Sequence, residues 1–123
     1  MNIRNSLGLD IDIQDNGSVR SIAVSPVRIS LKASNPFSVS GANIWLRKRA
    51  DNIEYTALLG PGSNSRFTIE DNAYFVAGSW AGLVYTCSLQ LSGKSLSWLW
   101  RIEIENTSDG AVEADIILSL IHI

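Results

Sequence analysis

Hydrophobic and polar residues alternate along much of this chain, and the alternation is clearest from residue 98 to residue 105. Every second side chain there is large and apolar: Trp98, Trp100, Ile102 and Ile104. A period of two is typical of a β-strand with one buried face. Residues 112–120 repeat the pattern, and the polar residues 106–110 between the two runs favour a turn. We therefore predict a long antiparallel hairpin, whose apolar face needs a further layer of structure to cover it.

The same alternation predicts strands through the rest of the chain. Further strand-like runs occupy residues 7–13, 19–24, 27–31, 43–49, 55–59, 67–70, 74–76 and 83–91. Turn-forming residues separate them: the Asn16-Gly17 dipeptide and residues 34–41, 60–65 and 92–95. No run has a convincing helical period. We therefore predict an all-β fold, an antiparallel β-sandwich of about nine or ten strands, in a single domain that spans residues 1–123.

The composition is typical of a globular protein, with 46% hydrophobic and 18% charged residues. A formal net charge of −2 gives no long-range attraction for nucleic acid or for an anionic membrane surface, so we expect neither partner. The first residues lack the apolar core of a signal peptide, and no apolar run approaches the length of a membrane span. We therefore expect a cytoplasmic protein.

Few residues suited to catalysis or metal binding are present. Cys87 is the only cysteine and lies in the alternating run 83–91, so we predict a small strand side chain rather than a nucleophile or metal ligand. His122 is the only histidine, so we expect neither a catalytic triad nor a histidine-rich metal site. Glu103 and Glu105 point the same way on a predicted strand, a pattern more typical of solvated surface than of an acid/base pair. We expect no metal and no other cofactor.

The four tryptophans divide into two pairs. Trp98 and Trp100 are either a platform for a sugar ring or part of the core, and their shared face with isoleucines favours the core. Trp45 lies near arginines on a face that we expect to point outward, and Trp80 lies between glycines close to a turn. Aromatic side chains beside polar groups on an exposed face are typical of a binding patch.

The candidate carbohydrate-binding residues are therefore Trp45, Trp80, Tyr74 and Arg47. The basic run 47–49 has a second interpretation, as a solvated edge strand whose charges discourage the addition of another strand.

The C-terminal run, which begins at Ile116 and ends at Ile123, carries apolar residues on both faces and has no closing turn. Such a strand is normally buried on both sides or paired with another strand. We therefore expect a homo-oligomer that covers this run.

Six blocks of the sequence, in order, resemble the N-terminal region of the 1,2-β-oligoglucan phosphorylases. These enzymes are relatives of cellobiose phosphorylase and of cyclic β-1,2-glucan synthase in glycoside hydrolase family 94. The blocks are residues 2–9, 16–20, 42–49, 58–67, 78–85 and 98–108. The most specific of them begins Leu58-Leu59-Gly60-Pro61. The resemblance spans nearly the whole chain and itself implies a β-sandwich.

In that family the sandwich precedes an (α/α)6 barrel, which holds the general-acid aspartate and the phosphate site for reversible, inverting phosphorolysis of β-glucosidic bonds. None of the barrel residues lies in this sequence, so the resemblance implies a module that is not an enzyme. Its expected role is packing, oligomerisation or weak contact with a β-glucan oligosaccharide. The alternative is a stand-alone carbohydrate-binding protein.

Overall fold

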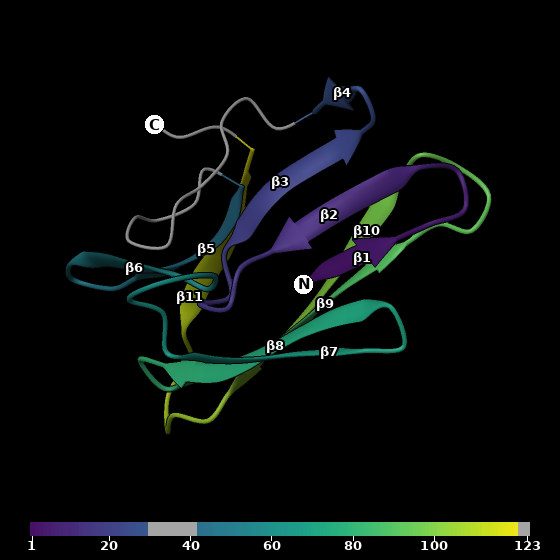
Figure 1. Cartoon of the computed structure of the whole chain (residues 1–123). Coiled ribbons are helices and arrows are strands. Elements are labelled where there is room, and N and C mark those ends of the chain that lie inside the picture. Colours follow the sequence, from purple (N-terminus) through teal and green to yellow (C-terminus); the bar gives the residue numbers. More distant parts are fainter. Residues whose placement is uncertain (30–41, 121–123) are drawn as a thin grey trace.

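The computed structural model describes residues 1–29 and 42–120, which contain eleven strands and no helix. The strands form three antiparallel sheets, two of four strands and one of three. Figure 1 shows the arrangement of the sheets. The prediction of an all-β antiparallel fold is confirmed, and the strand number slightly exceeds the expected value of about nine or ten.

The first sheet has the order β1-β2-β3-β4. Its strands are β1 (Asn2–Arg4), β2 (Leu9–Ile13), β3 (Val19–Val24) and β4 (Val27–Arg28). The β2–β3 hairpin forms as predicted, and Gly17 adopts a positive φ of 89° in its turn. The sequence pattern missed β1, which is only three residues long. Of the strand predicted at residues 27–31, Val27–Arg28 form β4. The crossing loop predicted at residues 34–41 lies outside the described residues.

The second sheet has the order β10-β9-β8-β7. Its strands are β7 (Ser65–Glu70), β8 (Ala73–Trp80), β9 (Leu83–Leu91) and β10 (Trp98–Asn106). β9 and β10 form a hairpin around the turn predicted at residues 92–95, with Trp98 opposite Leu91 at one end and Asn106 opposite Leu83 at the other. β8 is longer than predicted because Gly78 continues the strand.

The third sheet has the order β11-β5-β6, from β5 (Asn43–Arg49), β6 (Ile53–Ala57) and β11 (Glu113–Ser119). The predicted hairpin of residues 98–105 with residues 112–120 is wrong, because β10 pairs with β9 while β11 pairs with β5 in another sheet. The interpretation of residues 47–49 as an edge strand is also wrong, since β5 is the central strand of its sheet.

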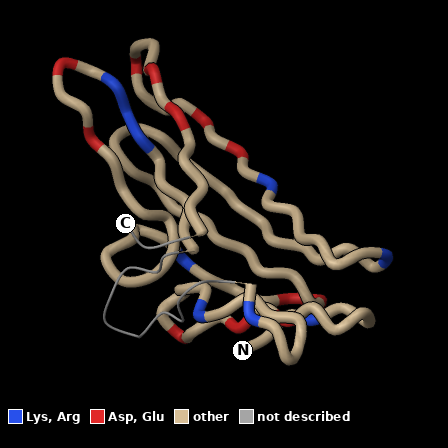
Figure 2. Tube along the Cα trace, turned by 90° about the horizontal axis from the view of Figure 1, so that it is seen from above, with Lys and Arg blue, Asp and Glu red and all other residues tan. Residues whose placement is uncertain are grey.

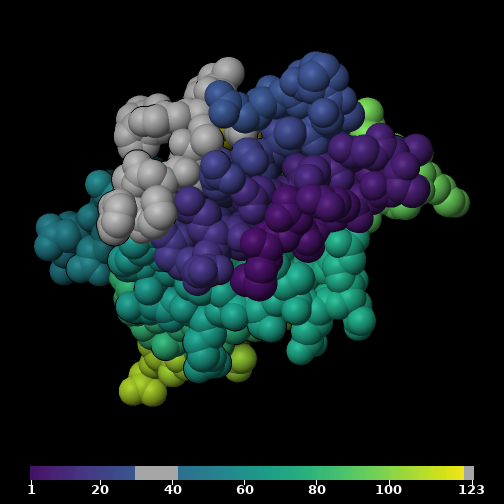
Figure 3. Space-filling view, viewed as in Figure 1, coloured from purple at the N-terminus to yellow at the C-terminus, as the bar shows by residue number. Residues whose placement is uncertain are grey.

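The hydrophobic core lies where the inner faces of the three sheets meet. Its fully buried members come from the three sheets and from the segment that follows β6: Ile3, Leu9, Ile11 and Ile13; Ile44 and Leu46; Tyr74, Val76, Tyr85 and Leu89; Leu58 and Leu59 after β6. The Tyr74 hydroxyl donates a hydrogen bond of 2.6 Å to the Gly17 carbonyl oxygen, and so joins the second sheet to the first. Figure 3 shows the purple and blue first sheet lying directly on the teal strands of the second.

Candidate functional site

The outer face of the third sheet brings aromatic and charged side chains together. Directly opposed residues of neighbouring strands share a face. Trp45 is opposite Ile117, and Arg47 is opposite both Asp115 and Tyr55. We call the surface formed by these five residues the Trp45 face. Two of them, Trp45 and Arg47, are among the residues predicted from sequence, and the other three come from strands that sequence reasoning did not place beside β5.

The aromatic part of the Trp45 face is an edge-to-face pair. The ring centroids of Trp45 and Tyr55 are 6.0 Å apart, with 68° between the planes. Trp45 is half-buried, and its indole Nε1 donates a 3.4 Å hydrogen bond to Ser119 Oγ. Tyr55 is 67% exposed. The pair therefore offers an anchored aromatic surface that is open to solvent.

The charged part of the Trp45 face is a bidentate ion pair. Arg47 Nε donates to Asp115 Oδ1 at 2.8 Å and Arg47 Nη2 donates to Asp115 Oδ2 at 2.6 Å, while Arg49 Nη2 adds a third bond at 3.3 Å. Hydrogen bonding from Arg47 lowers the pKa of Asp115 to about 2, and the same bond raises the pKa of Arg47. Figure 2 shows the blue stretch of β5 at the end of the molecule where several acidic positions gather.

The other two predicted site residues lie on the inner face of β8. Tyr74 is 1% exposed, and its ring lies 6.2 Å from that of Trp100. Desolvation by burial raises the pKa of Tyr74 above its ordinary value. Trp80 shares this inner face and packs, partly buried, against the core at the end of the strand. The fold therefore separates Tyr74 and Trp80 from the Trp45 face, and Tyr74 has no surface left for a ligand.

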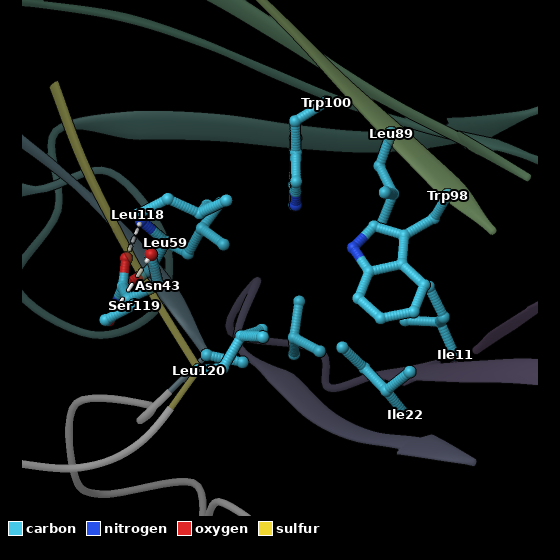
Figure 4. A pocket seen from close by; sticks show the side chains of 12 residues that line it. Ile11, Ile22, Asn43, Leu59, Leu89, Trp98, Trp100, Leu118, Ser119 and Leu120 are labelled. Atoms are coloured by element: carbon cyan, nitrogen blue, oxygen red, sulfur yellow. Dashed lines mark hydrogen bonds between the residues drawn. The ribbon is translucent and has the colours of Figure 1, made fainter. Parts of the chain in front are cut away.

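Trp98 and Trp100 fill interior space, as predicted. Both indoles pack against the core from the inner face of β10. Figure 4 shows them pointing into a cavity that Leu118 and Leu120 border from the other side. The cavity volume is about 10 Å³, roughly the space that one water molecule requires. A sugar ring does not fit there.

A second surface, which sequence reasoning missed, lies on the outer face of the second sheet. It is a groove of about 440 Å³, in the size range of small-ligand sites. Its lining side chains are Phe75, Thr86, Ser88, Gln90, Leu99, Arg101 and Glu103. We call it the β9 groove. The available signal was the hydroxyl and amide side chains at alternate positions of β9, to which the sequence analysis assigned no role.

The described residues offer little for catalysis. Cys87 is 2% exposed, and desolvation by burial raises the pKa of its thiol to about 11, so it stays protonated near neutral pH. This confirms the prediction of a structural cysteine, whereas His122 lies outside the described residues.

Residues 1–29 and 42–120 hold no group of three or more His, Cys, Asp or Glu side chains placed to bind a metal ion. The same part of the chain has no helix long and apolar enough to cross a membrane.

The fold defines the class of this protein: an all-β module whose described residues form three antiparallel sheets. The chain belongs to the SOGP N-terminal domain family, the N-terminal domain of 1,2-β-oligoglucan phosphorylases, whose family model matches residues 12–120. This match confirms the resemblance seen in the sequence. The matched residues make up nearly the whole of the 123-residue sequence. No curated protein matches the chain.

Proposed function

We propose that this chain is a non-catalytic module that makes weak contact with a β-glucan through the Trp45 face. One observation carries the proposal: an anchored aromatic pair and a bidentate ion pair lie side by side on one open sheet face. A glucose ring has an apolar face of C–H groups and a rim of hydroxyls. The rings of Trp45 and Tyr55 can pack against the C–H face, and the polar atoms of Arg47 and Asp115 can form hydrogen bonds with the hydroxyls.

The affinity expected for this face is low. The face is open, so it buries only one side of a sugar, and neither Arg47 nor Asp115 can bind hydroxyls without sharing its existing bonds. We expect a dissociation constant on the order of 1 mM, which corresponds to about −4 kcal/mol. A constant near 1 μM would instead favour the alternative, a stand-alone carbohydrate-binding protein.

Tryptophan fluorescence tests the proposal. Wild-type protein is titrated with β-1,2- and β-1,4-linked gluco-oligosaccharides, alongside Trp45→Ala and Trp80→Ala. We expect a saturable change that is lost in Trp45→Ala and kept in Trp80→Ala, since Trp80 lies on the inner face of the other sheet. No change at several times the expected constant, in protein shown to be folded by circular dichroism, would reject the proposal.

Assembly is a second candidate function, favoured by a separate observation. Among the described strands, β11 lies at an edge of its sheet, and consecutive side chains on both of its faces are exposed: Ile116 by 40%, Ile117 by 42% and Leu118 by 55%. Large apolar side chains on an unpaired edge favour association with another strand. We propose that the C-terminal run from Ile116 to Ile123 supports a homo-oligomer.

Sedimentation equilibrium at micromolar concentration tests this assembly. We expect a mass above that of the 13.4 kDa chain, reduced to the monomer by Leu118→Lys. Ile53→Lys is the matched control, because Ile53 is 62% exposed on β6, at the opposite edge of the same sheet. A monomeric wild-type mass, or equal dissociation by both variants, would contradict a role for β11.

A further inference from the structure

The β9 groove has a polar floor whose hydrogen-bonding groups are free. Thr86, Ser88 and Gln90 occupy alternate positions of β9, so their side chains share one face and follow each other at about 6.6 to 6.8 Å. Within residues 1–29 and 42–120 these side chains make no hydrogen bond to another protein group. A ligand that lies along β9 would therefore meet three successive groups able to donate or accept hydrogen bonds.

Apolar side chains border the polar floor on its two sides. Phe75 of β8 stands directly opposite Ser88, and Leu99 of β10 stands directly opposite Gln90. Phe75 is 37% exposed and Leu99 is 64% exposed. Large apolar side chains beside convergent polar groups are typical of a site for a small amphipathic ligand, and a pyranose with its C–H face and hydroxyl rim has this character.

The charges at the groove favour a neutral ligand. Arg101 is opposite Ser88 and Glu103 is opposite Thr86, and Arg101 Nη2 lies 2.8 Å from Glu103 Oε1. The two charges cancel and are both largely exposed to solvent, so neither an anion nor a cation finds an unpaired opposite charge here. Their oxygen and nitrogen atoms still offer further acceptors and donors to hydroxyl groups.

The position of the groove also argues against an extended peptide as its ligand. Its floor belongs to β9 and one wall to β8, both internal strands with both edges already paired. A peptide that binds by strand addition needs a free backbone edge. The floor offers side-chain groups, which suit hydroxyl-rich molecules.

We propose that the β9 groove is a second carbohydrate site, which takes a neutral oligosaccharide lengthwise along β9 with one pyranose packed on Phe75. It involves no residue of the Trp45 face and is carried by a different sheet, so it extends the proposed glycan contact to a separate surface. The module then contacts a long glycan at two places.

Backbone amide chemical-shift mapping by NMR tests this site, because each amide reports its own position. The uniformly ¹⁵N-labelled protein is titrated with cellohexaose and with linear β-1,2-linked gluco-oligosaccharides. We expect saturable shifts at the amides of Thr86, Ser88, Gln90 and Leu99. These shifts should persist when NaCl is raised to about 1 M, since a neutral ligand gains little from charge attraction.

Two variants separate the groove from the rest of its sheet face. Phe75→Ala removes the aromatic wall and should weaken binding at the groove by about tenfold. Val84→Ala is the matched control. Val84 is 37% exposed, like Phe75, and lies on the outer face of the same sheet, on β9, but it does not line the groove. We expect the control to bind within about twofold of wild type.

The possible results distinguish the two proposals. Shifts at the groove that weaken in Phe75→Ala and survive in Val84→Ala support the β9 site, whether or not the Trp45 face also responds. Shifts confined to β5, β6 and β11 would overturn the β9 site and leave the Trp45 proposal standing. Shifts at neither sheet, or shifts at the groove that are lost when NaCl is raised, would also overturn it.

Discussion

Asp115 is a surface carboxylate whose ionisation depends on two arginines of the neighbouring strand. Hydrogen bonds from Arg47 are the largest reason that its pKa falls to about 2, from an ordinary value of 3.8. A carboxylate with a depressed pKa in the folded state contributes stability above its unfolded pKa, and this contribution is lost as the pH falls through the folded value. The ion pair therefore holds at neutral pH and weakens as the pH falls from about 4 to 2.

This gives the first prediction. A carboxyl-detected NMR titration should place the midpoint of Asp115 near 2 in wild type, and Arg47→Ala should move it toward 3.8. Arg20→Ala is the control, since Arg20 pairs with Asp12 in another sheet. A midpoint for Asp115 that is the same in wild type and Arg47→Ala would show that the bidentate pair does not form in solution.

Cys87 gives the second prediction, which also concerns pH. Here the stability of the fold decreases as the pH rises, whereas the Asp115 ion pair loses its contribution as the pH falls. Its thiol pKa is raised from 9.0 to about 11 by burial, so the folded state holds this proton more tightly than the unfolded state. Stability is then fully present below pH 9 and falls as the pH rises from 9 to 11. The loss should approach ~2 kcal/mol, measured by urea unfolding at a series of pH values. Cys87→Ala should remove much of the slope between pH 9 and 10, and an unchanged slope there would reject the explanation.

At the scale of the element, β8 depends on the absence of a side chain at Gly78. A Cβ built at this position would lie 2.5 Å from both the Asn64 carbonyl oxygen and the Tyr85 hydroxyl oxygen. The Tyr85 hydroxyl is itself held by Ser65 Oγ at 2.6 Å, so it has little freedom to move. Gly78, which lies beyond the strand predicted at residues 74–76, is thus what allows β7, β8 and β9 to approach each other.

The third prediction follows from this contact. Gly78→Ala should lower the free energy of unfolding by about 1–3 kcal/mol, because the added methyl group forces its neighbours apart. Gly93→Ala is the matched control, since a Cβ there meets no atom within 4 Å. Urea unfolding compares the two variants, and equal stabilities would show that the strands can part at Gly78 without cost.

At the scale of the whole molecule, polar contacts link the sheets across a largely apolar core. The hydrogen bond from Tyr74 to the Gly17 carbonyl oxygen is one of them, and it is buried. Asn5 Nδ2 makes a second link, donating to the Ser92 carbonyl oxygen at 2.9 Å. When a buried acceptor loses its donor, it is left without a hydrogen-bond partner. The resulting loss in the free energy of unfolding is larger than the net contribution of the hydrogen bond.

The fourth prediction concerns this link. Tyr74→Phe should keep the ring packing with Trp100 and lower the free energy of unfolding by about 1–3 kcal/mol, because it leaves the Gly17 carbonyl oxygen unpaired. Tyr55→Phe is the control, since Tyr55 is 67% exposed. The expected result is a single cooperative transition shifted to lower urea. A variant as stable as wild type would show that water replaces the lost bond.

The sequence alone determined most of the strands, two of the hairpins and the family. Period-two alternation marks strands because neighbouring side chains point to opposite faces, and turn chemistry is local, so residues 9–24 and 83–106 could be paired from their own sequence. The same local reasoning placed Trp98 and Trp100 in the core and Cys87 on a strand. It also identified Trp45 and Arg47 as neighbours on one face, since both lie on the same strand.

Only the tertiary structure decided which strands meet across long stretches of chain. β11 joins β5 rather than β10, and that pairing is what places Asp115 beside Arg47, 68 residues away. Likewise, Tyr74 is buried because the first sheet covers the face of β8 on which it lies. The local sequence pattern alone could not predict this burial. Alternation tells which residues share a face, but which face becomes interior is set by long-range packing of one sheet on another.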